Sequence, residues 1–380
     1  MRKIAGLGYV HLALTTIPFL QRRLLQPLKE SLLEDARLGS FREDSYFKES
    51  EVVDEKTTQT EALLHALSRV KGIAVLKGES GLGKTHFLRY IAKHNPGTAV
   101  FLTANQCRGG VVEAIANKLL GFARDEDLLN SLVYNGALTI DIDEVSPDTR
   151  VRISEFLSRF NKARCLITTQ PIDWPLPERV VTYRLLPLKK EKIKDFITSR
   201  PSQFDSSTSS ITREDFLIRC DHFLSDSLDN KQLLKDEEAL NQKVLSNPMD
   251  LSIVAHMLYH GRKPNLLNLQ GEYYGLVANI YQDIHGTNFP IASFSEYVFE
   301  MRLKDKDFLP MDIYYREVQC MVEHKMVIIT IEAFGEKRSK NGVSGTIKYG
   351  NTLSPNPFWP IPREQESISK THAFEASTSC

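Results

Sequence analysis

Residues 78–85 read Gly-Glu-Ser-Gly-Leu-Gly-Lys-Thr, and this stretch decides what the chain can fold into. A short apolar run, 72–77 (GIAVLK), precedes it, and a helical pattern, 84–93 (KTHFLRYIAK), follows it. A strand, a glycine-rich turn and a helix in this order match the pattern GxxxxGK[ST], in which successive backbone N–H groups converge on phosphate oxygens. The three glycines permit backbone angles closed to other residues, and the helix start adds the positive end of its dipole. The sequence therefore predicts a phosphate-binding loop.

The residues of this loop take separate roles in a nucleoside-triphosphate site. We expect the Lys84 ammonium to bridge the β- and γ-phosphates and to take part in catalysis, and the Thr85 hydroxyl to ligate Mg²⁺. The residues predicted to bind the nucleotide are Gly78, Glu79, Ser80, Gly81, Leu82, Gly83, Lys84, Thr85, His86 and, from a later strand, Gln170.

An acidic pair ends a second apolar pattern, 138–144 (LTIDIDE). Ligands of parallel sheets bind beyond the carboxyl ends of the strands. This favours Asp143 as a metal ligand through water and Glu144 as the general base for an attacking water. Alternation puts Asp141 on the same side as Asp143, so Asp141 stays open as a second acidic contact.

A further strand pattern ends in polar residues, 167–170 (ITTQ). A polar side chain at such a strand end can sense the γ-phosphate or orient the water, and Thr169 and Gln170 are the candidates. A strand-terminal turn explains the same residues equally well.

Apolar, β-branched runs alternate with helical patterns through the first half of the chain. Predicted strands cover 72–77, 98–103, 137–142, 164–168 and 180–185, and predicted helices cover 84–93, 111–120 and 150–160. This alternation predicts an α/β fold, a P-loop NTPase parallel sheet sandwiched by helices. Beyond Pro187 the periodicity is helical, and at 326–331 (MVIITI) it returns to a strand.

The bulk composition narrows the class of protein. With 380 residues, 42% of them hydrophobic and 25% charged, the chain has the make-up of a soluble globular protein of two to three domains. Its 48 basic and 48 acidic residues balance, which does not favour nucleic acid as a partner. A basic run at 189–194 contains a glutamate and fits a solvated helix face better than a nucleic-acid contact. Five scattered cysteines without CxxC spacing favour reduced thiols over a disulfide framework.

The N-terminal segment leaves three alternatives open. Residues 4–20 are uncharged and lie between Arg2-Lys3 and Arg22-Arg23, at the lower limit of length for a membrane span. The segment is a membrane-proximal or membrane-spanning helix, an apolar helix packed on the domain or, least favoured, a signal peptide. If it anchors the chain, the flanking arginines keep the following domain at the cytoplasmic face of the membrane.

Together these segments resemble the STAND class of P-loop ATPases, and within it the NACHT-like group, which is related to the AAA+ ATPases. GESGLGKTHFLRYIA is similar to the Walker A segment, LTIDIDE to the Walker B segment, and LITTQP to a sensor strand that often ends in arginine, here Gln170. Residues 183–197 resemble the strand and helix that leave the ATPase core. Asn247-Pro248 resembles the start of a helix in the small helical domain. The likeness spans residues 61–260.

The resemblance implies a signal-transduction switch with weak Mg²⁺-dependent ATPase activity. A closed ADP form would open on exchange for ATP and then form a homo-oligomer or release an effector protein. The resemblance also implies adenine as the base, with its contact within 52–58, and a winged-helix-like region in which His324 is the candidate for a β-phosphate contact. It implies a cytoplasmic location, where the nucleotide is present. Because no sensor repeat or effector is recognisable, we expect a fragment, a truncated product, or a member whose effector is the apolar N-terminal segment.

Two other functions compete with the switch. One is an AAA+-type remodelling or DNA-associated ATPase with a winged helix, which would need an arginine finger. Arg159, Arg164 and Arg179 lie in the usual region. The other is a nucleotide-binding scaffold without useful turnover, against which the Asp143-Glu144 pair argues. The Asn247-Pro248 helix start favours the switch.

The expected domain organisation follows from these patterns. Residues 1–36 form an apolar and amphipathic N-terminal segment, 37–59 a linker, 60–188 the P-loop ATPase core, 189–290 the helical domain, 291–350 the winged-helix-like region and 351–380 a disordered tail. Residues 24–36 and 60–70 are predicted helices, the second with Thr60 as its N-cap.

Overall fold

The computed structural model describes residues 17–39, 41–119, 124–200, 211–229, 235–303, 308–310, 313–323, 328–330 and 346–348. The chain divides into two compact units, residues 1–273 and residues 274–380. The first unit contains the phosphate-binding loop and the acidic pair. The predicted tail at 351–380, most of the apolar segment 4–20 and the candidate His324 lie outside the described residues.

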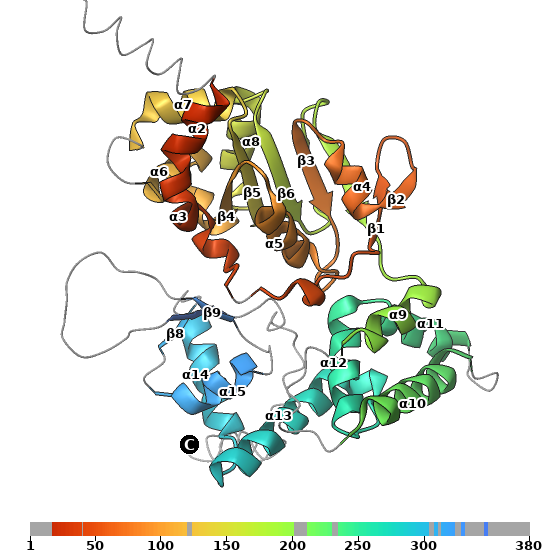
Figure 1. Cartoon of the computed structure of the whole chain (residues 1–380). Helices are drawn as coiled ribbons and strands as arrows, with labels where there is room; N and C mark the ends of the chain where they lie inside the picture. Colours follow the sequence, from red (N-terminus) through yellow and green to blue (C-terminus); the bar gives the residue numbers. More distant parts are fainter. Residues whose placement is uncertain are drawn as a thin grey trace, which may run out of the picture. The chain divides into compact units, whose positions relative to one another are not determined.

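A seven-stranded mixed sheet forms the centre of the first unit (Figure 1). Its strands are β1 (Glu51–Asp54), β2 (Thr60–Ala62), β3 (Ile73–Lys77), β4 (Thr98–Thr103), β5 (Leu138–Val145), β6 (Arg164–Thr169) and β7 (Val181–Leu185). The order across the sheet is β2-β1-β7-β3-β6-β5-β4, and the five strands from β7 to β4 are parallel. The predicted parallel sheet is confirmed for these five strands.

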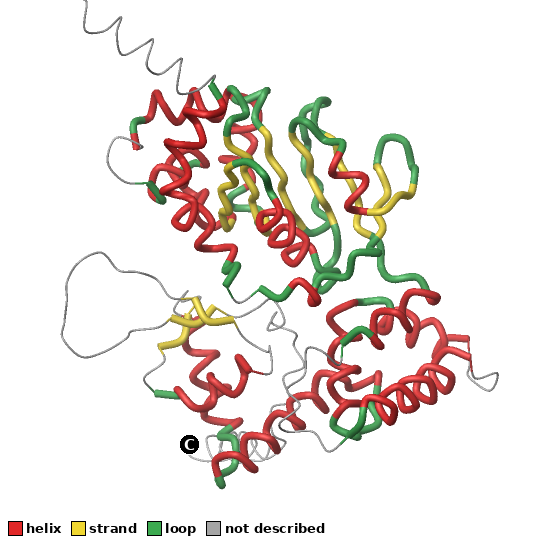
Figure 2. The backbone as a smooth tube through the Cα atoms, in the orientation of Figure 1, coloured by secondary structure: helices red, strands yellow, loops and turns green. Residues whose placement is uncertain are grey.

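Helices cover both faces of this sheet, as predicted (Figures 1 and 2). They are α4 (Leu63–Ser68), α5 (Lys84–His94), α6 (Val111–Asn117), α7 (Glu126–Tyr134) and α8 (Arg150–Arg159). Helices α6, α7 and α8 share one core with Val75, Ile140 and Ile142 of the sheet. Helices α4 and α5 share a second core with Leu76 and Phe101. Strands β3, β4 and β6 contribute to both cores because consecutive side chains of a strand point to opposite faces.

The edge of the sheet beside β7 differs from the prediction. Residues 51–54, which we expected in a linker, form β1, and β1 pairs antiparallel with β7. Residues 60–62, expected to open a helix capped by Thr60, form β2 instead, and the helix begins only at Leu63. The reason is tertiary: without β1 the outer edge of β7 would leave a row of backbone donors and acceptors unpaired.

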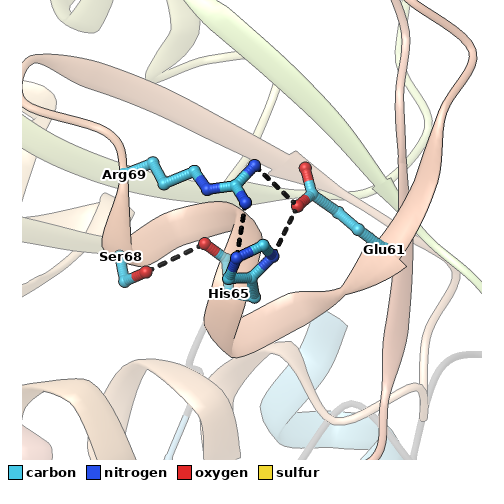
Figure 3. Close-up of polar contacts among 4 residues, drawn as sticks. All are labelled: Glu61, His65, Ser68 and Arg69. Carbon is cyan, nitrogen blue, oxygen red and sulfur yellow. Dashed lines mark hydrogen bonds and ion pairs between the residues drawn. The ribbon is translucent and has the colours of Figure 1, made fainter.

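A polar cluster lies at the junction between β2 and α4 (Figure 3). Glu61 Oε2 is 3.0 Å from His65 Nδ1 and accepts a hydrogen bond from Arg69 Nη1 at 3.4 Å. Arg69 Nη2 also contacts His65 Nε2. Side chains four residues apart meet on one face of a helix, so this spacing lets α4 tie itself back to the last residues of the hairpin.

The predicted amphipathic helix at 24–36 is divided. Residues 18–36 form α2 (Pro18–Leu25), α3 (Lys29–Leu33) and 3₁₀ turns at Gln26–Leu28 and Glu34–Ala36. Pro27 lacks the N–H that a continuous helix would need, which accounts for the first break. Leu25 and Leu32 are buried in the core of the first unit. Among the described residues, no helix has the length and apolar character needed to cross a membrane.

Beyond β7 the chain becomes helical, as the periodicity predicted. The helices are α9 (Lys190–Thr198), α10 (Arg213–Leu224), α11 (Lys235–Leu245), α12 (Pro248–Tyr259) and α13 (Leu269–His285). The lysines of the basic run each pair with an acidic residue: Lys189 with Glu51, Lys190 with Asp229, Lys192 with Glu49 and Lys194 with Asp221. These ion pairs engage the run within the first unit.

The second unit combines helices with a small sheet. It begins within α13 and continues with α14 (Ile291–Leu303), β8 (Phe308–Pro310), α15 (Tyr315–Glu323), β9 (Ile328–Thr330) and β10 (Thr346–Lys348). The three strands are antiparallel in the order β8-β10-β9. The winged-helix-like region at 291–350 stays a prediction.

Candidate nucleotide-binding site

The phosphate-binding loop leaves the carboxyl end of β3 and enters α5. Gly83, with a φ of 94°, is the N-cap residue, so Lys84 and Thr85 lie in the first turn of α5. Lys84 is only 9% exposed, and its Nζ donates to the carbonyl oxygens of Gly78 at 2.6 Å and of Glu79 at 2.8 Å. The ammonium therefore lies over the loop itself, beside a helix N-terminus that favours anions.

Two glycines and a leucine shape the loop. The N–H of Gly78 donates to the carbonyl of Thr169 at 3.1 Å, and a Cβ on Gly78 would lie 3.1 Å from Leu185 Cβ, so the end of β3 is closely packed. Gly81 has a φ of 84°, a conformation that L side chains rarely adopt. Leu82 is buried in the core beneath α5 and anchors the loop.

Three strand ends meet where the loop begins, and their order decides which residues touch. Strand β6 lies between β3, which leads into the loop, and β5, which carries the acidic pair. Thr85 Oγ1 donates to Asp143 Oδ1 at 3.1 Å, and Thr168 Oγ1 donates to the same oxygen at 2.7 Å. The structure thus brings the two predicted metal-binding residues, Thr85 and Asp143, into contact.

A β-bulge interrupts β5 at the acidic pair. Ile142 pairs with Ile167 and Val145 with Thr169, so β5 has one residue more than β6 between these two pairs. Glu144 lies within the bulge with a φ of 63°, in the left-handed region. The bulge brings Glu144 to the carboxyl edge of the sheet, where much of the residue is exposed while neighbouring protein atoms still shield its carboxyl group from water.

The surroundings of Asp143 and Glu144 raise the pKa of both carboxyl groups. Burial, and next the neighbouring Asp143 carboxylate, raise the pKa of Glu144 to about 7, although Lys84 opposes this shift. Burial also raises the pKa of Asp143, against the hydrogen bonds from Thr168 and Thr85 and the positive charges of Arg89 and Lys84. Burial lowers the pKa of Lys84. Two carboxyl groups held this close favour the binding of a cation between them and the loop.

Asp141 differs sharply from Asp143. It is fully buried in the middle of β5, and neither carboxylate oxygen has a hydrogen-bond partner among the described residues. Burial, and next the charge of Asp143, raise its pKa well above the ordinary value. Of the two aspartates that the sequence left open, Asp143 is the one that contacts Thr85.

The remaining predicted site residues lie around the same edge. Glu79, Ser80 and His86 are exposed, and so is Gln170, which directly follows β6. Thr169, the other sensor candidate, is fully buried, and its hydroxyl donates to a backbone carbonyl at 3.3 Å.

The segment 52–58, which the resemblance implies for the base, runs from β1 into the following turn. Val52 is buried, whereas Glu55 Oε2 lies 2.9 Å from the Nζ of Lys77, the residue just before the loop. The segment is thereby tied to the start of the loop. Its role in base binding stays a prediction.

The helical part of the first unit also reaches the loop, through the start of α12. Asn247 is the N-cap of α12, and its Oδ1 accepts from the N–H of Met249 at 2.9 Å. Its Nδ2 donates to the carbonyl of Ser80 at 3.0 Å, and the N–H of Met249 donates to the carbonyl of Gly81 at 3.2 Å. A Cβ on Gly81 would lie 2.4 Å from Asn247 Oδ1, so only glycine leaves room for this side chain. We call these contacts the Asn247 latch.

The residues present fit a nucleoside triphosphate with Mg²⁺. A buried ammonium and the N-terminus of an eleven-residue helix, α5, provide positive potential for phosphate. The Thr85 hydroxyl and the Asp143 carboxylate are hard oxygen ligands of the kind that Mg²⁺ prefers, and they already lie within hydrogen-bond distance of each other.

The parallel sheet, the loop and the acidic strand end together define an α/β P-loop NTPase fold. No family model and no curated protein matches the chain. Among solved structures, the chain is similar to a STAND protein with a tetratricopeptide-repeat sensor from Pyrococcus horikoshii. The two are 13% identical with a TM-score of 0.38, and the match covers 81% of this chain and 43% of the STAND chain. A mutant RuvB from Thermotoga maritima is 10% identical, with a TM-score of 0.30 over 76% of this chain and 88% of its own. A katanin structure is 18% identical, with a TM-score of 0.26 over 53% of this chain and 77% of its own. The chain thus spans less than half the length of the STAND structure.

Sequence reasoning missed one residue of the site and the contact of another. Thr168 was placed inside a strand, whereas its hydroxyl lies between the two acidic residues. Asn247 was noted as a helix start, but nothing in its local sequence indicates a contact with a loop more than 160 residues earlier in the chain. Thr168 lay within a predicted strand, but its place between the loop strand and the acidic strand depends on the strand order, for which the sequence has no local signal.

Proposed function

We propose that this chain is a nucleotide-controlled switch that binds ATP or ADP with Mg²⁺, hydrolyses ATP slowly and passes the nucleotide state to its helical part. The main observation in support of this proposal is the Asn247 latch, which links the phosphate-binding loop to α12. The loop that would hold the phosphates is bonded through its own carbonyls, those of Ser80 and Gly81, to the start of α12. A change in the path of the loop therefore has to move α12 or break these bonds.

The predicted residues divide the binding of the nucleotide between them. The loop from Gly78 to Gly83 and the ammonium of Lys84 would hold the phosphates, and Lys84 would exchange its bonds to the loop carbonyls for bonds to phosphate oxygens. Thr85 and Asp143 would hold Mg²⁺, which when bound supplies charge neutralisation at the phosphates. Segment 52–58 would contact the adenine.

Hydrolysis would rest on Glu144. Its carboxyl group has a pKa of about 7, so at neutral pH a substantial fraction is ionised and able to accept a proton from water. Gln170 is exposed at the same edge and would contact the γ-phosphate or orient the water. A neutral amide in place of the arginine found in the related family offers less charge stabilisation, which is consistent with slow turnover.

The output of the switch would be a protein contact. We propose that the ATP form presents a surface for a homo-oligomer or an effector protein, and that the chain acts in the cytoplasm. Nucleic acid is a weaker candidate because the lysines of the basic run at 189–194 pair with acidic residues of the first unit.

Binding and turnover are the first test. Fluorescent ATP and ADP are titrated, with and without Mg²⁺, into the wild type, Lys84→Ala and Glu144→Gln. We expect binding to be lost in Lys84→Ala, and binding without turnover in Glu144→Gln. A wild type that binds neither nucleotide would refute the proposal.

The coupling is tested by amide hydrogen exchange at the start of α12. In the Glu144→Gln background, ATP and ADP should give different exchange rates at 247–252. Asn247→Ala should erase the difference while nucleotide still binds. Asn265→Ala is the matched control, because it removes an N-cap asparagine of the same kind, bonded to the N–H of Leu267 at 3.0 Å, from a short 3₁₀ turn. Equal exchange with ATP and ADP in the Glu144→Gln parent would argue for a scaffold rather than a switch.

A further inference from the structure

Thr168 of β6 forms hydrogen bonds with both residues of the acidic pair. It is the second-to-last residue of β6, the strand inserted between the loop strand and the acidic strand, and it is fully buried. Its hydroxyl makes two hydrogen bonds at once. It donates to Asp143 Oδ1 at 2.7 Å and accepts from the N–H of Glu144 at 2.9 Å.

The second bond matters because of the bulge. An extra residue in β5 disrupts the parallel ladder between Ile142 and Val145, so backbone groups there lose their regular partners on β6. The hydroxyl of Thr168 accepts the N–H of Glu144 at this point. The same bond holds a non-glycine residue at a φ of 63°, an unfavourable conformation that needs support from its surroundings.

The first bond matters because of Thr85. Both threonine hydroxyls donate to the same oxygen of Asp143. If Thr85 turns towards a metal ion, Thr168 is the donor that still fixes the direction of the carboxylate. The two bonds of Thr168 therefore set the rotamer of Asp143 and the backbone of Glu144 from one buried atom.

We propose that Thr168 is a positioning residue that clamps the β5 bulge, holding Asp143 towards the metal site and Glu144 towards the attacking water. Its single hydroxyl hydrogen is donated to Asp143, so it has no donor left for a phosphate oxygen and acts through the acidic pair rather than on the nucleotide. This inference rests on the proposed ATPase function for its effect on turnover. The clamp itself is a property of the chain without nucleotide.

The test compares Thr168→Val, which keeps the shape and removes the hydroxyl, with Thr168→Ser, which keeps the hydroxyl. Thr182→Val is the matched control, a buried threonine of β7 outside the site. The first readout is amide exchange at Glu144 in the nucleotide-free protein. We expect exchange to speed up by about 5- to 10-fold in Thr168→Val, because the N–H of Glu144 loses its acceptor, and to stay near the wild-type rate in Thr168→Ser and Thr182→Val.

The second readout is steady-state hydrolysis beside ADP affinity. We expect the kcat of Thr168→Val to fall by about 10- to 100-fold, as for the loss of a hydrogen bond to a charged group, with the Kd for ADP changed by less than about threefold. Thr168→Ser should recover most of kcat. Unchanged exchange at Glu144 in Thr168→Val, an equally impaired Thr168→Ser, or a parallel loss of ADP binding would each overturn the clamp.

The two readouts separate this inference from the proposed function. If the wild type turns over no ATP, the ATPase proposal fails, and exchange at Glu144 alone decides whether Thr168 holds the bulge. If the wild type hydrolyses ATP and Thr168→Val is unaffected in both readouts, the ATPase proposal stands and the clamp falls.

Discussion

Asp141→Asn should make the first unit more stable, and increasingly so as the pH rises. Asp141 is fully buried in β5, and its carboxylate oxygens lack hydrogen-bond partners among the described residues. Burial raises its pKa above the unfolded value of about 3.9. Asparagine keeps the size and shape of the side chain but cannot ionise, so the substitution removes the titration and little else.

The sign and the size of this pH dependence follow from the different proton binding of Asp141 in the native and unfolded states. Above the unfolded pKa, the unfolded chain has released the proton of Asp141 while the native chain still holds it. The native state therefore loses stability as the pH rises, until the native pKa is passed. The slope of this loss is at most about 1.4 kcal/mol per pH unit. The unfolding free energy of Asp141→Asn minus that of the wild type should grow by up to this amount per unit above about pH 4.

Chemical denaturation followed by fluorescence measures this difference, because Trp174 is buried in a core of the same unit. The curves of the two proteins are compared at about pH 5, 6 and 7. Asp148→Asn is the control: the hydrogen bond from Ser146 lowers the pKa of that exposed carboxyl, so it is ionised in both states above about pH 4 and its difference from the wild type should not change between about pH 5 and 7. A difference between Asp141→Asn and wild type that stays constant with pH would refute an ionisable, uncompensated carboxyl at this position.

Three further predictions concern Glu144, Gly81 and Lys192 of the first unit. The rate of ATP hydrolysis should rise with pH and then level off once Glu144 is ionised, because Glu144 must lose its proton to act as a base; a flat kcat profile would speak against this role. Gly81→Ala should lower the Tm and speed ADP release, since its φ is 84° and its Cβ would lie 2.4 Å from Asn247 Oδ1; adding Asn247→Gly should recover only the part due to the clash. Lys192→Ala should weaken the protein only slightly and only at low salt, because its ion pair with Glu49 is exposed; a large loss that salt does not alter would show a structural role.

Much of the fold was predicted from the sequence because its signals are local. The loop at 78–85 depends on residues adjacent in the chain, and so does the alternation of buried strands with helices. The acidic pair was predicted for the same reason, since the end of an apolar strand indicates which residues reach the edge of a sheet. Segment 51–62 shows the limit: its strands form because β7 needs a partner, and no local pattern records that need.

The sequence by itself determined that this chain has a phosphate-binding loop, an acidic strand end and an α/β sheet to carry them. Only the tertiary structure decided how these parts meet. The strand order placed Thr168 between the loop strand and the acidic strand, and the bulge brought Glu144 to the edge of the sheet. Asp141 is fully buried within β5, whereas Asp143 reaches the loop. The packing of α12 brought Asn247 into contact with the loop. Each of these depends on which distant segments pair, and such contacts are set by the burial and hydrogen bonding of the whole unit rather than by neighbouring residues.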